Sequence, residues 1–226
     1  MNVNLAMKKI STGLLLFLLS FQAFSQDLFP HTQQKWVDSV FNSLSVDEKI
    51  GQMLMPRGNV ADTYDTTRLY SIVKDYHVGG FVLFKGHPVK QAILVNELQQ
   101  RTKVPLFIGM DLEWGLAMRL DSTFRFPYQM TLGAMQGNTA LIEKMGVQIG
   151  EQCRRMGVHI NYAPVVDVNN NPLNPVINFR SFGENREDVT AKSLAYMRGL
   201  QKAGIITSAK HFPGHGDTGV DSHFDI

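Results

Sequence analysis

The chain has 226 residues, of which 44% are hydrophobic and 19% are charged. This composition is typical of a globular protein and excludes a disordered or fibrous chain. The formal charge is +2, from 22 basic and 20 acidic residues, and the only notable basic cluster is Arg154-Arg155. The charge pattern therefore predicts no nucleic-acid partner.

Residues 1–25 are predicted to be a secretory signal peptide. Lys8 and Lys9 precede the apolar run GLLLFLLSFQAF, and small residues lead to an expected cleavage after Ser25. A single membrane anchor is the alternative, but the run is shorter than the roughly 20 residues that a span needs. We therefore expect an exported protein, periplasmic or extracellular, with no stable membrane insertion after cleavage.

Residues 26–44 are expected to form a lead-in helix, and the main domain is expected to run from 45 to 226. Ser45 and Glu48 have the spacing of a capping box at the start of the next helix. Further along, apolar residues recur at helical spacing in two stripes, formed by Leu69, Ile72, Val73 and Tyr76 and by Ile142, Met145, Ile149, Cys153 and Met156. The single cysteine belongs to the second stripe, so we expect it in the core.

Short apolar stretches predict five strands, at residues 52–55, 79–84, 105–110, 157–167 and 204–209. Gly79, Gly157 and Gly204 each fall where a helix would end and a strand would begin. Strands alternating with helices imply an α/β fold with a parallel sheet. Their number and length favour a TIM-type (β/α)8 barrel, here incomplete with about five βα units, over an open sheet.

Polar side chains follow three of the predicted strands. Chemistry in parallel α/β proteins lies at the carboxyl ends of the strands, so these side chains are expected to line one pocket. The third strand is followed by Asp111, Glu113 and Arg119, the fourth by Asp167 and Arg180, and the fifth by Lys210 and His211.

The closing loop, KHFPGHGDTGVDSH, allows two interpretations. In the first, His211 and His215 form a metal pair at i, i+4 spacing, completed by His223 with Asp217 or Asp221. Pro-Gly between the two histidines argues against the helix that this spacing requires, so we expect no metal.

In the second interpretation, Asp221 and His223 act as a pair. A carboxylate that binds one imidazole nitrogen fixes the tautomer and stabilises the cation, which suits the ring to general acid/base catalysis near neutral pH. D-x-H also arises by chance, and a solvated loop is the alternative.

Four segments of the chain resemble family 3 of the glycoside hydrolases, in its β-N-acetylglucosaminidase branch. They are LSVDEKIGQMLM, DLEWGLAMRL, NFRSFGEN and the closing loop, and the resemblance runs from about Ser45 to the end. One departure follows the first aspartate, where Trp114 and Leu116 stand in place of a glycine and an arginine. Trp114 and Phe182 would either stack on sugars or be buried.

The resemblance implies a role for each polar residue after the strands. Asp111, Arg180, Lys210 and His211 would hold the hydroxyls of the first sugar, and Arg119 would bind substrate or brace Asp111. Asp221 and His223 would be the acid/base dyad, and Glu113 would be structural. No cofactor is required.

The implied activity is that of an exo-acting, retaining glycosidase that releases terminal β-linked N-acetylhexosamine from cell-wall fragments or glycans. Such enzymes use a carboxylate nucleophile. The family's nucleophile is an aspartate after a later strand, and no residue of this sequence matches it. We therefore expect an N-terminal fragment of the barrel, which by itself aggregates or stays partly disordered and shows no turnover.

Three alternatives remain open at this level. They are a non-catalytic sugar-binding barrel, a family 3 enzyme that acts on another β-glycoside or as a phosphorylase, and a metal-dependent amidohydrolase-like barrel.

Overall fold

The computed structural model describes residues 33–60 and 66–224, which fall into two units divided after Ser43. The first unit contains helix α2 (Gln34–Ser43), which has no buried residue and lies in the range where a lead-in helix is expected. The predicted signal peptide lies outside the described residues. Within the described ranges, no helix has the length and apolar character needed to cross a membrane.

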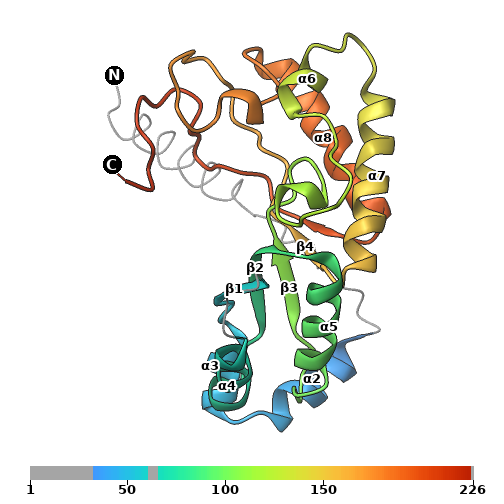
Figure 1. Cartoon of the computed structure of the whole chain (residues 1–226), viewed down its shortest axis with the longest axis vertical. Helices are drawn as coiled ribbons and strands as arrows, with labels where there is room; N and C mark the ends of the chain where they lie inside the picture. The colour runs from blue at the N-terminus through green and yellow to red at the C-terminus, as the bar shows by residue number, and fades with distance from the viewer. Residues whose placement is uncertain (1–32, 61–65, 225–226) are drawn as a thin grey trace, which may run out of the picture. The chain divides into compact units, whose positions relative to one another are not determined.

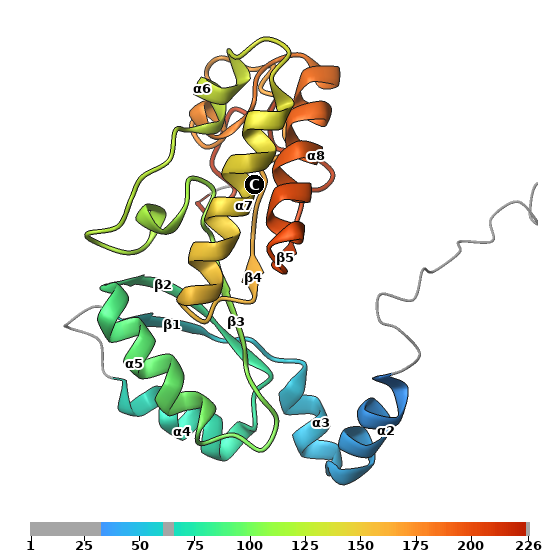
Figure 2. The ribbon, with the colours of Figure 1, turned by 90° about the vertical axis from the view of Figure 1, so that its right-hand side faces the viewer.

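The second unit is built on a sheet of five parallel strands (Figures 1 and 2). The strands are hydrogen-bonded in their order along the chain: β1 (Arg57–Val60), β2 (Gly80–Gly86), β3 (Phe107–Met110), β4 (Ile160–Asn161) and β5 (Ile206–Thr207). In an open doubly wound sheet the order reverses at a switch point, whereas sequential order with right-handed crossovers keeps every helix on one face. The sheet is therefore part of a TIM-type barrel, which confirms the predicted fold class.

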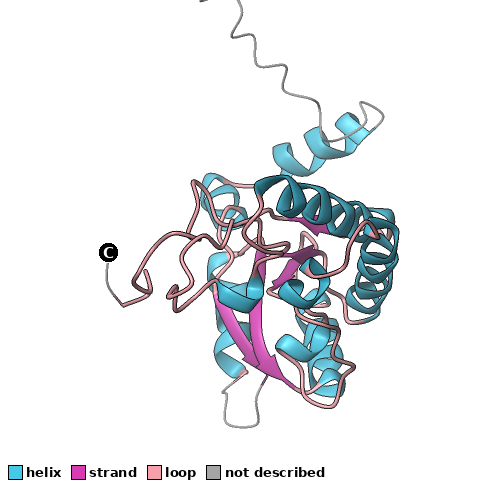
Figure 3. Ribbon diagram, turned by 90° about the horizontal axis from the view of Figure 1, so that it is seen from above, coloured by secondary structure: helices cyan, strands magenta, loops and turns pink. Residues whose placement is uncertain are grey.

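Helices follow the strands and cover the outer side of the sheet (Figure 3). They are α4 (Thr67–Tyr76), α5 (Pro88–Gln99), α7 (Thr139–Arg155) and α8 (Arg186–Lys202). Helix α3 (Val46–Gln52) precedes β1, and the short helices η2 (Leu116–Met118), α6 (Gln129–Gly133) and η3 (Asn178–Arg180) lie in the segments after β3 and β4. The capping box of Ser45 and Glu48 is present at the start of α3. The stripe of α7 is confirmed from Ile142 to Cys153, which are buried, whereas the stripe of α4 is confirmed only in part: Leu69 and Val73 are buried, but Tyr76 is 63% exposed.

The core lies between the strands and these helices. Phe81 and Leu83 of β2 and Ile108 of β3 are fully buried there. Successive side chains of a strand point to opposite faces, so Phe107, which is next to Ile108, lies on the inner face of β3, where it is 46% exposed. Cys153 is also buried in this core, and burial raises the pKa of its thiol to about 12.

The prediction for the first strand, residues 52–55, is wrong. Helix α3 continues to Gln52 and is capped by Met53, whose side chain is 83% exposed, so these apolar residues do not form a buried strand. The strand lies later, at Arg57–Val60, and alternates between buried and more exposed residues. The apolar pattern did not predict this strand because it contains polar residues. One of them, Arg57, lies on the inner side with its guanidinium 4.3 Å from the centre of the Phe84 ring.

The fourth predicted strand, residues 157–167, is much shorter than expected. Only Ile160–Asn161 forms β4. Pro164 lacks an N–H group and cannot complete the ladder. Pairing with the segment after β5 resumes irregularly, where the Val166 N–H donates to the carbonyl of Lys210 over 2.6 Å.

Helices α7 and α8 cross with their backbones in close contact. A Cβ added at Gly199 would lie 2.2 Å from the carbonyl oxygen of Glu143, and one added at Gly146 would lie 2.6 Å from that of Tyr196. Both positions therefore exclude any side chain.

We expect Gly199→Ala to destabilise the protein by about 2 kcal/mol, since backbone atoms of α7 must move to accept the methyl group. The measurement is urea unfolding of the protein expressed from its complete gene. Gly219→Ala is the matched control, because a Cβ there meets no atom within 4 Å, and its effect should stay within about 0.5 kcal/mol. Equal stability of the two variants would contradict the close crossing.

Candidate active site

Loops that follow β3, β4 and β5 lie at the same end of the sheet (Figure 1). Asp111 comes directly after β3, and Lys210 is held near it by the irregular pairing of its segment with Val165 and Val166. Asn161 of β4 fixes the intervening backbone, because its side chain accepts from the Leu112 N–H over 3.0 Å and donates to the Leu112 carbonyl over 3.3 Å. The fold thus brings together residues that are 99 positions apart.

Two carboxylates and three cations form one connected network there, which we call the Asp111 cluster. Asp111 accepts from Arg119 Nη2 over 2.7 Å at Oδ2 and from Lys210 Nζ over 2.8 Å at Oδ1. Lys210 Nζ also lies 2.8 Å from Glu113 Oε1. Arg180 donates to both oxygens of Glu113, from Nε over 3.0 Å and from Nη2 over 2.8 Å.

Both carboxylates of the cluster stay ionised despite their burial. Burial alone would raise the pKa of Asp111, but Lys210 and Arg119 outweigh it and lower the pKa below its usual value. The Glu113 side chain is fully buried, and the hydrogen bonds from Arg180 together with the charge of Lys210 again lower its pKa. Asp111, whose side chain is 20% exposed, is therefore an ionised acceptor that a ligand can reach.

Arg119 is held by fewer contacts than its neighbours. Its guanidinium lies over the Phe84 ring, 4.7 Å from the centroid, and bonds Asp111 through Nη2. Its buried Nε has no acceptor among the described residues. Gly115 lies in the same loop and has a φ of 82° and a ψ of −170°, a backbone conformation that glycine adopts without strain and other residues rarely adopt. A Cβ at Gly115 would also lie 2.7 Å from the Phe126 ring.

His211 lies beside the Asp111 cluster but bonds a different carboxylate. Its Nδ1 is 2.6 Å from Asp167 Oδ2, while Asp167 Oδ1 accepts from the His215 N–H over 2.6 Å. Burial raises the pKa of Asp167, but the hydrogen bonds from His211 and His215 reverse this and lower it. An ionised Asp167 accepts a hydrogen bond from the Nδ1–H of His211, which leaves Nε2 as the ring nitrogen that makes no contact with Asp167.

The predicted dyad forms a separate pair. His223 Nδ1 lies 2.6 Å from Asp221 Oδ1, and the same oxygen accepts from the His223 N–H over 3.0 Å. These two hydrogen bonds lower the pKa of Asp221. The side chain of His223 is 77% exposed, and no hydrogen bond or ion pair between described residues joins the dyad to the Asp111 cluster.

The histidines of the closing loop do not converge on one point. His215 is buried, and its ring nitrogens contact Thr218 Oγ1 and Ser222 Oγ. Over the described ranges, no group of three histidine, cysteine, aspartate or glutamate side chains is placed to hold a metal ion. His215 therefore braces the loop that carries the dyad.

Two features of the site were not predicted. Asp167 was expected only from its place after a strand, yet it orients His211 through a hydrogen bond. One sequence does not show that residues at the ends of two different strands pair with each other. Tyr162 lies on the inner face against Gly109, and burial with the nearby Asp111 raises its pKa. Phe182 is 2% exposed in the core, whereas Trp114 packs edge-on against Tyr128, with ring centroids 4.9 Å apart.

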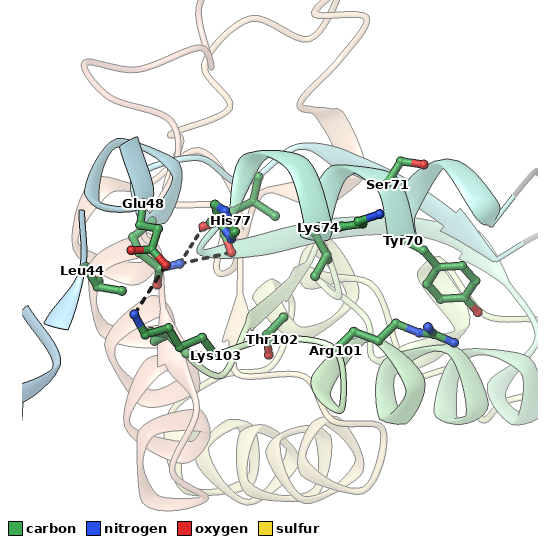
Figure 4. Close-up of a pocket in the computed structure, with 13 residues that line it drawn as sticks. Leu44, Glu48, Tyr70, Ser71, Lys74, His77, Arg101, Thr102 and Lys103 are labelled. Atoms are coloured by element: carbon green, nitrogen blue, oxygen red, sulfur yellow. Dashed lines mark hydrogen bonds and ion pairs between the residues drawn. The ribbon is translucent and has the colours of Figure 1, made fainter. Parts of the chain in front are cut away.

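Cavities lie at both ends of the sheet. One of about 510 Å³ is lined by Asp167 and His211, and one of about 520 Å³ reaches Arg119. A larger cavity of about 660 Å³ lies at the amino ends of the strands (Figure 4). Its acid, Glu48, is already bonded to the Ser45 N–H and paired with Lys103, so it holds no free acid/base pair. Size alone therefore does not identify the site.

Curated proteins similar to this chain include β-hexosaminidases and a β-N-acetylglucosaminidase/β-glucosidase of Cellulomonas fimi. Beta-hexosaminidase A of Pseudoalteromonas piscicida is 35% identical over 206 residues, which cover 80% of this chain and 34% of that protein. Beta-hexosaminidase LpqI of Mycobacterium tuberculosis is 34% identical over 185 residues, which cover 80% of this chain and 46% of that protein. The chain thus spans less than half the length of these relatives.

Solved structures agree with this relationship. A glycoside hydrolase family 3 β-N-acetylglucosaminidase from Paenibacillus sp. str. FPU-7 superposes with a TM-score of 0.72 at 39% identity, covering 80% of this chain and 35% of that one. Beta-glucoside phosphorylase BglX bound to 2FGlc superposes with a TM-score of 0.79 at 28% identity, covering 86% and 35%. Residues 45–226 match the glycosyl hydrolase family 3 N-terminal domain, and the chain therefore belongs to this family.

Proposed function

We propose that this protein is an exo-acting, retaining glycosidase that removes terminal β-linked N-acetylhexosamine from cell-wall fragments or glycans. The observation that carries the proposal is the ionised, partly exposed Asp111, held between Lys210 and Arg119 at the carboxyl end of β3. The names of the β-hexosaminidase relatives support the choice of sugar.

In this proposal the Asp111 cluster binds the terminal sugar. The Asp111 carboxylate accepts hydrogen bonds from sugar hydroxyls, while Lys210, Arg180 and the Nε2 side of His211 provide donors or acceptors around the ring. Hydrogen bonds to charged groups are about twice as strong as neutral ones, and they hold the sugar in one orientation. Glu113, whose side chain is fully buried, does not contact the sugar and instead positions Lys210 and Arg180 through its ion pairs.

His223 is proposed as the acid/base. With Nδ1 bonded to Asp221, its Nε2 gives a proton to the glycosidic oxygen as a carboxylate attacks the anomeric carbon. In the second step Nε2 takes a proton from the water that releases the sugar. The nucleophile is assigned by resemblance to an aspartate after a later barrel strand, so the proposal concerns the product of the complete gene.

The exposed position of His223 favours a mobile role for its loop. In the structure the dyad is formed, and among the described residues it shares no hydrogen bond or ion pair with the Asp111 cluster; we infer that the loop closes over the bound sugar before proton transfer. A non-catalytic sugar-binding protein is the second candidate, because the cluster is complete without the dyad. A phosphorylase is a third, supported by the structural likeness to a β-glucoside phosphorylase.

We expect His223→Gln to lower kcat on 4-nitrophenyl N-acetyl-β-glucosaminide by about 10²–10⁴-fold in the protein expressed from its complete gene. KM should change little, since the sugar is held elsewhere. Steady-state kinetics measure both constants. Because 4-nitrophenolate leaves with little protonation, the loss with this substrate should fall mainly on the second step, in which His223 activates water, and a substrate with an alkyl leaving group should lose more activity. Unchanged turnover of the variant would remove His223 from the mechanism.

Sugar 1-phosphate formation separates hydrolysis from phosphorolysis. With inorganic phosphate added, the proposed hydrolase should still release free N-acetylhexosamine, as measured by chromatography of the products. Accumulation of sugar 1-phosphate would establish the phosphorylase instead, and binding without either product would establish the sugar-binding protein.

We expect Glu113→Gln to destabilise the protein by about 3 kcal/mol, because it leaves Lys210 and Arg180 with one carboxylate fewer in a buried site. Urea unfolding at neutral pH measures this change. Glu143→Gln is the matched control, since Glu143 pairs with the exposed Lys202 on the surface of α7 and α8, and its loss should cost less than about 1 kcal/mol.

The same pair of variants tests the pH dependence. The pKa of Glu113 is lower in the folded protein than in the unfolded chain, where it is about 4.3. Its contribution to stability is therefore complete above that value and is lost as the pH falls through the folded pKa. The free energy of unfolding should fall less between pH 5 and pH 3 in Glu113→Gln than in the parent, and an unchanged slope would contradict this role.

Export is proposed from Lys8, Lys9 and the apolar run that follows them. The mature protein, recovered from the periplasm or medium of the native host, should begin at Gln26 when its intact mass is measured. A protein that retains Met1 in the cytoplasm would contradict export.

A further inference from the structure

A cavity of about 520 Å³ opens beside Arg119, at the carboxyl ends of β1 and β2. Its wall combines the end of β2, the start of α5 and the loop around η2, and its charged and imidazole side chains are Lys85, His87, Lys90, Arg119 and Asp121. The function described above makes no use of it.

Positive charge dominates this cavity. Lys85, Lys90 and Arg119 line it, and Asp121 is the one acidic side chain among the described residues of its lining. Lys85 follows the buried part of β2, and its backbone N–H donates to Asn59 Oδ1 over 3.2 Å, which holds the residue at the strand end. No described residue bonds the ammonium group of Lys85.

His87 adds a donor to the same wall. It caps helix α5, and its Nδ1 accepts from the Val89 N–H over 3.3 Å. A ring whose Nδ1 accepts carries its proton on Nε2, so the neutral imidazole can donate from that atom. The cavity thus offers cations and N–H donors, the groups that select a carboxylate or a phosphate ester over a neutral ligand.

Arg119 joins this cavity to the proposed sugar pocket. Its Nη2 bonds Asp111, and its side chain also forms part of the cavity wall. A group held in this cavity and a sugar held by Asp111 would therefore share Arg119 as a neighbour, as two parts of one substrate can.

We propose that this cavity is a subsite for an anionic substituent, a carboxylate or a phosphate ester, that the substrate carries next to its terminal sugar. The inference rests on the proposed function and adds the charge of the substrate to it. A free phosphate ion has the same chemistry, and the experiment below separates the two sources.

The test compares two substrates of the protein expressed from its complete gene. They are 4-nitrophenyl N-acetyl-β-glucosaminide and its analogue with a carboxylate on the nitrophenyl ring. Lys85→Gln should lower kcat/KM for the carboxylated substrate about tenfold more than for the neutral one, mainly through KM. Lys85→Arg should restore the preference, and raised salt should weaken it in the parent.

Lys74→Gln is the matched control. Lys74 is an exposed lysine that lines the cavity at the opposite end of the sheet, and its loss should leave the ratio of the two kcat/KM values unchanged. A ratio that is also unchanged in Lys85→Gln would overturn the anionic subsite while leaving the proposed function intact. Failure of the parent to cleave either substrate would instead overturn the proposed function.

A last experiment uses inorganic phosphate to separate a substrate group from a free ion. As a competitor it should inhibit cleavage of the carboxylated substrate more than cleavage of the neutral one, and this difference should be lost in Lys85→Gln. Formation of sugar 1-phosphate that depends on Lys85 would show that the cavity binds a free acceptor, and would overturn the assignment to a substrate group.

Discussion

The ion pairs of Lys210 with Asp111 and Glu113 are the interaction on which the rest of this site depends. One ammonium group lies 2.8 Å from an oxygen of each carboxylate. It joins the segment after β5 to the loop after β3, and Arg180 ties the loop after β4 to the same Glu113. Three loops that are distant along the chain are held together in this way, with the cations keeping both buried carboxylates ionised.

The site has a rigid part, the Asp111 cluster, and a more exposed part, the His223–Asp221 pair. Asp111 and its partners are mostly buried, and each has a bonded neighbour that limits its rotation. The His223–Asp221 pair is formed in advance but lies on an exposed loop, braced through Ser222 by the buried His215. Such an arrangement suits a sugar pocket that is ready before binding and an acid/base that arrives with loop closure.

Several features of the fold were predictable from local pattern. The capping box at Ser45, the stripes of α4 and α7 and the strands β2 and β3 all follow from periodicity and end signals, which act over a few residues. The first strand was misplaced because apolar residues at a helix end resemble a strand, while the true strand, Arg57–Val60, carries polar side chains on its inner face. The length of the fourth was overestimated because Pro164 interrupts its ladder.

By itself the sequence determined the family, the alternation of strands and helices, and which polar residues follow the strands, since these depend on local order and on motifs. Only the tertiary structure decided that the strands pair in sequential order, that Glu113 bridges Lys210 and Arg180, and that Asp167 rather than Asp111 orients His211. These are contacts between segments far apart in the chain. Their partners are selected by distance and burial, neither of which a single sequence contains.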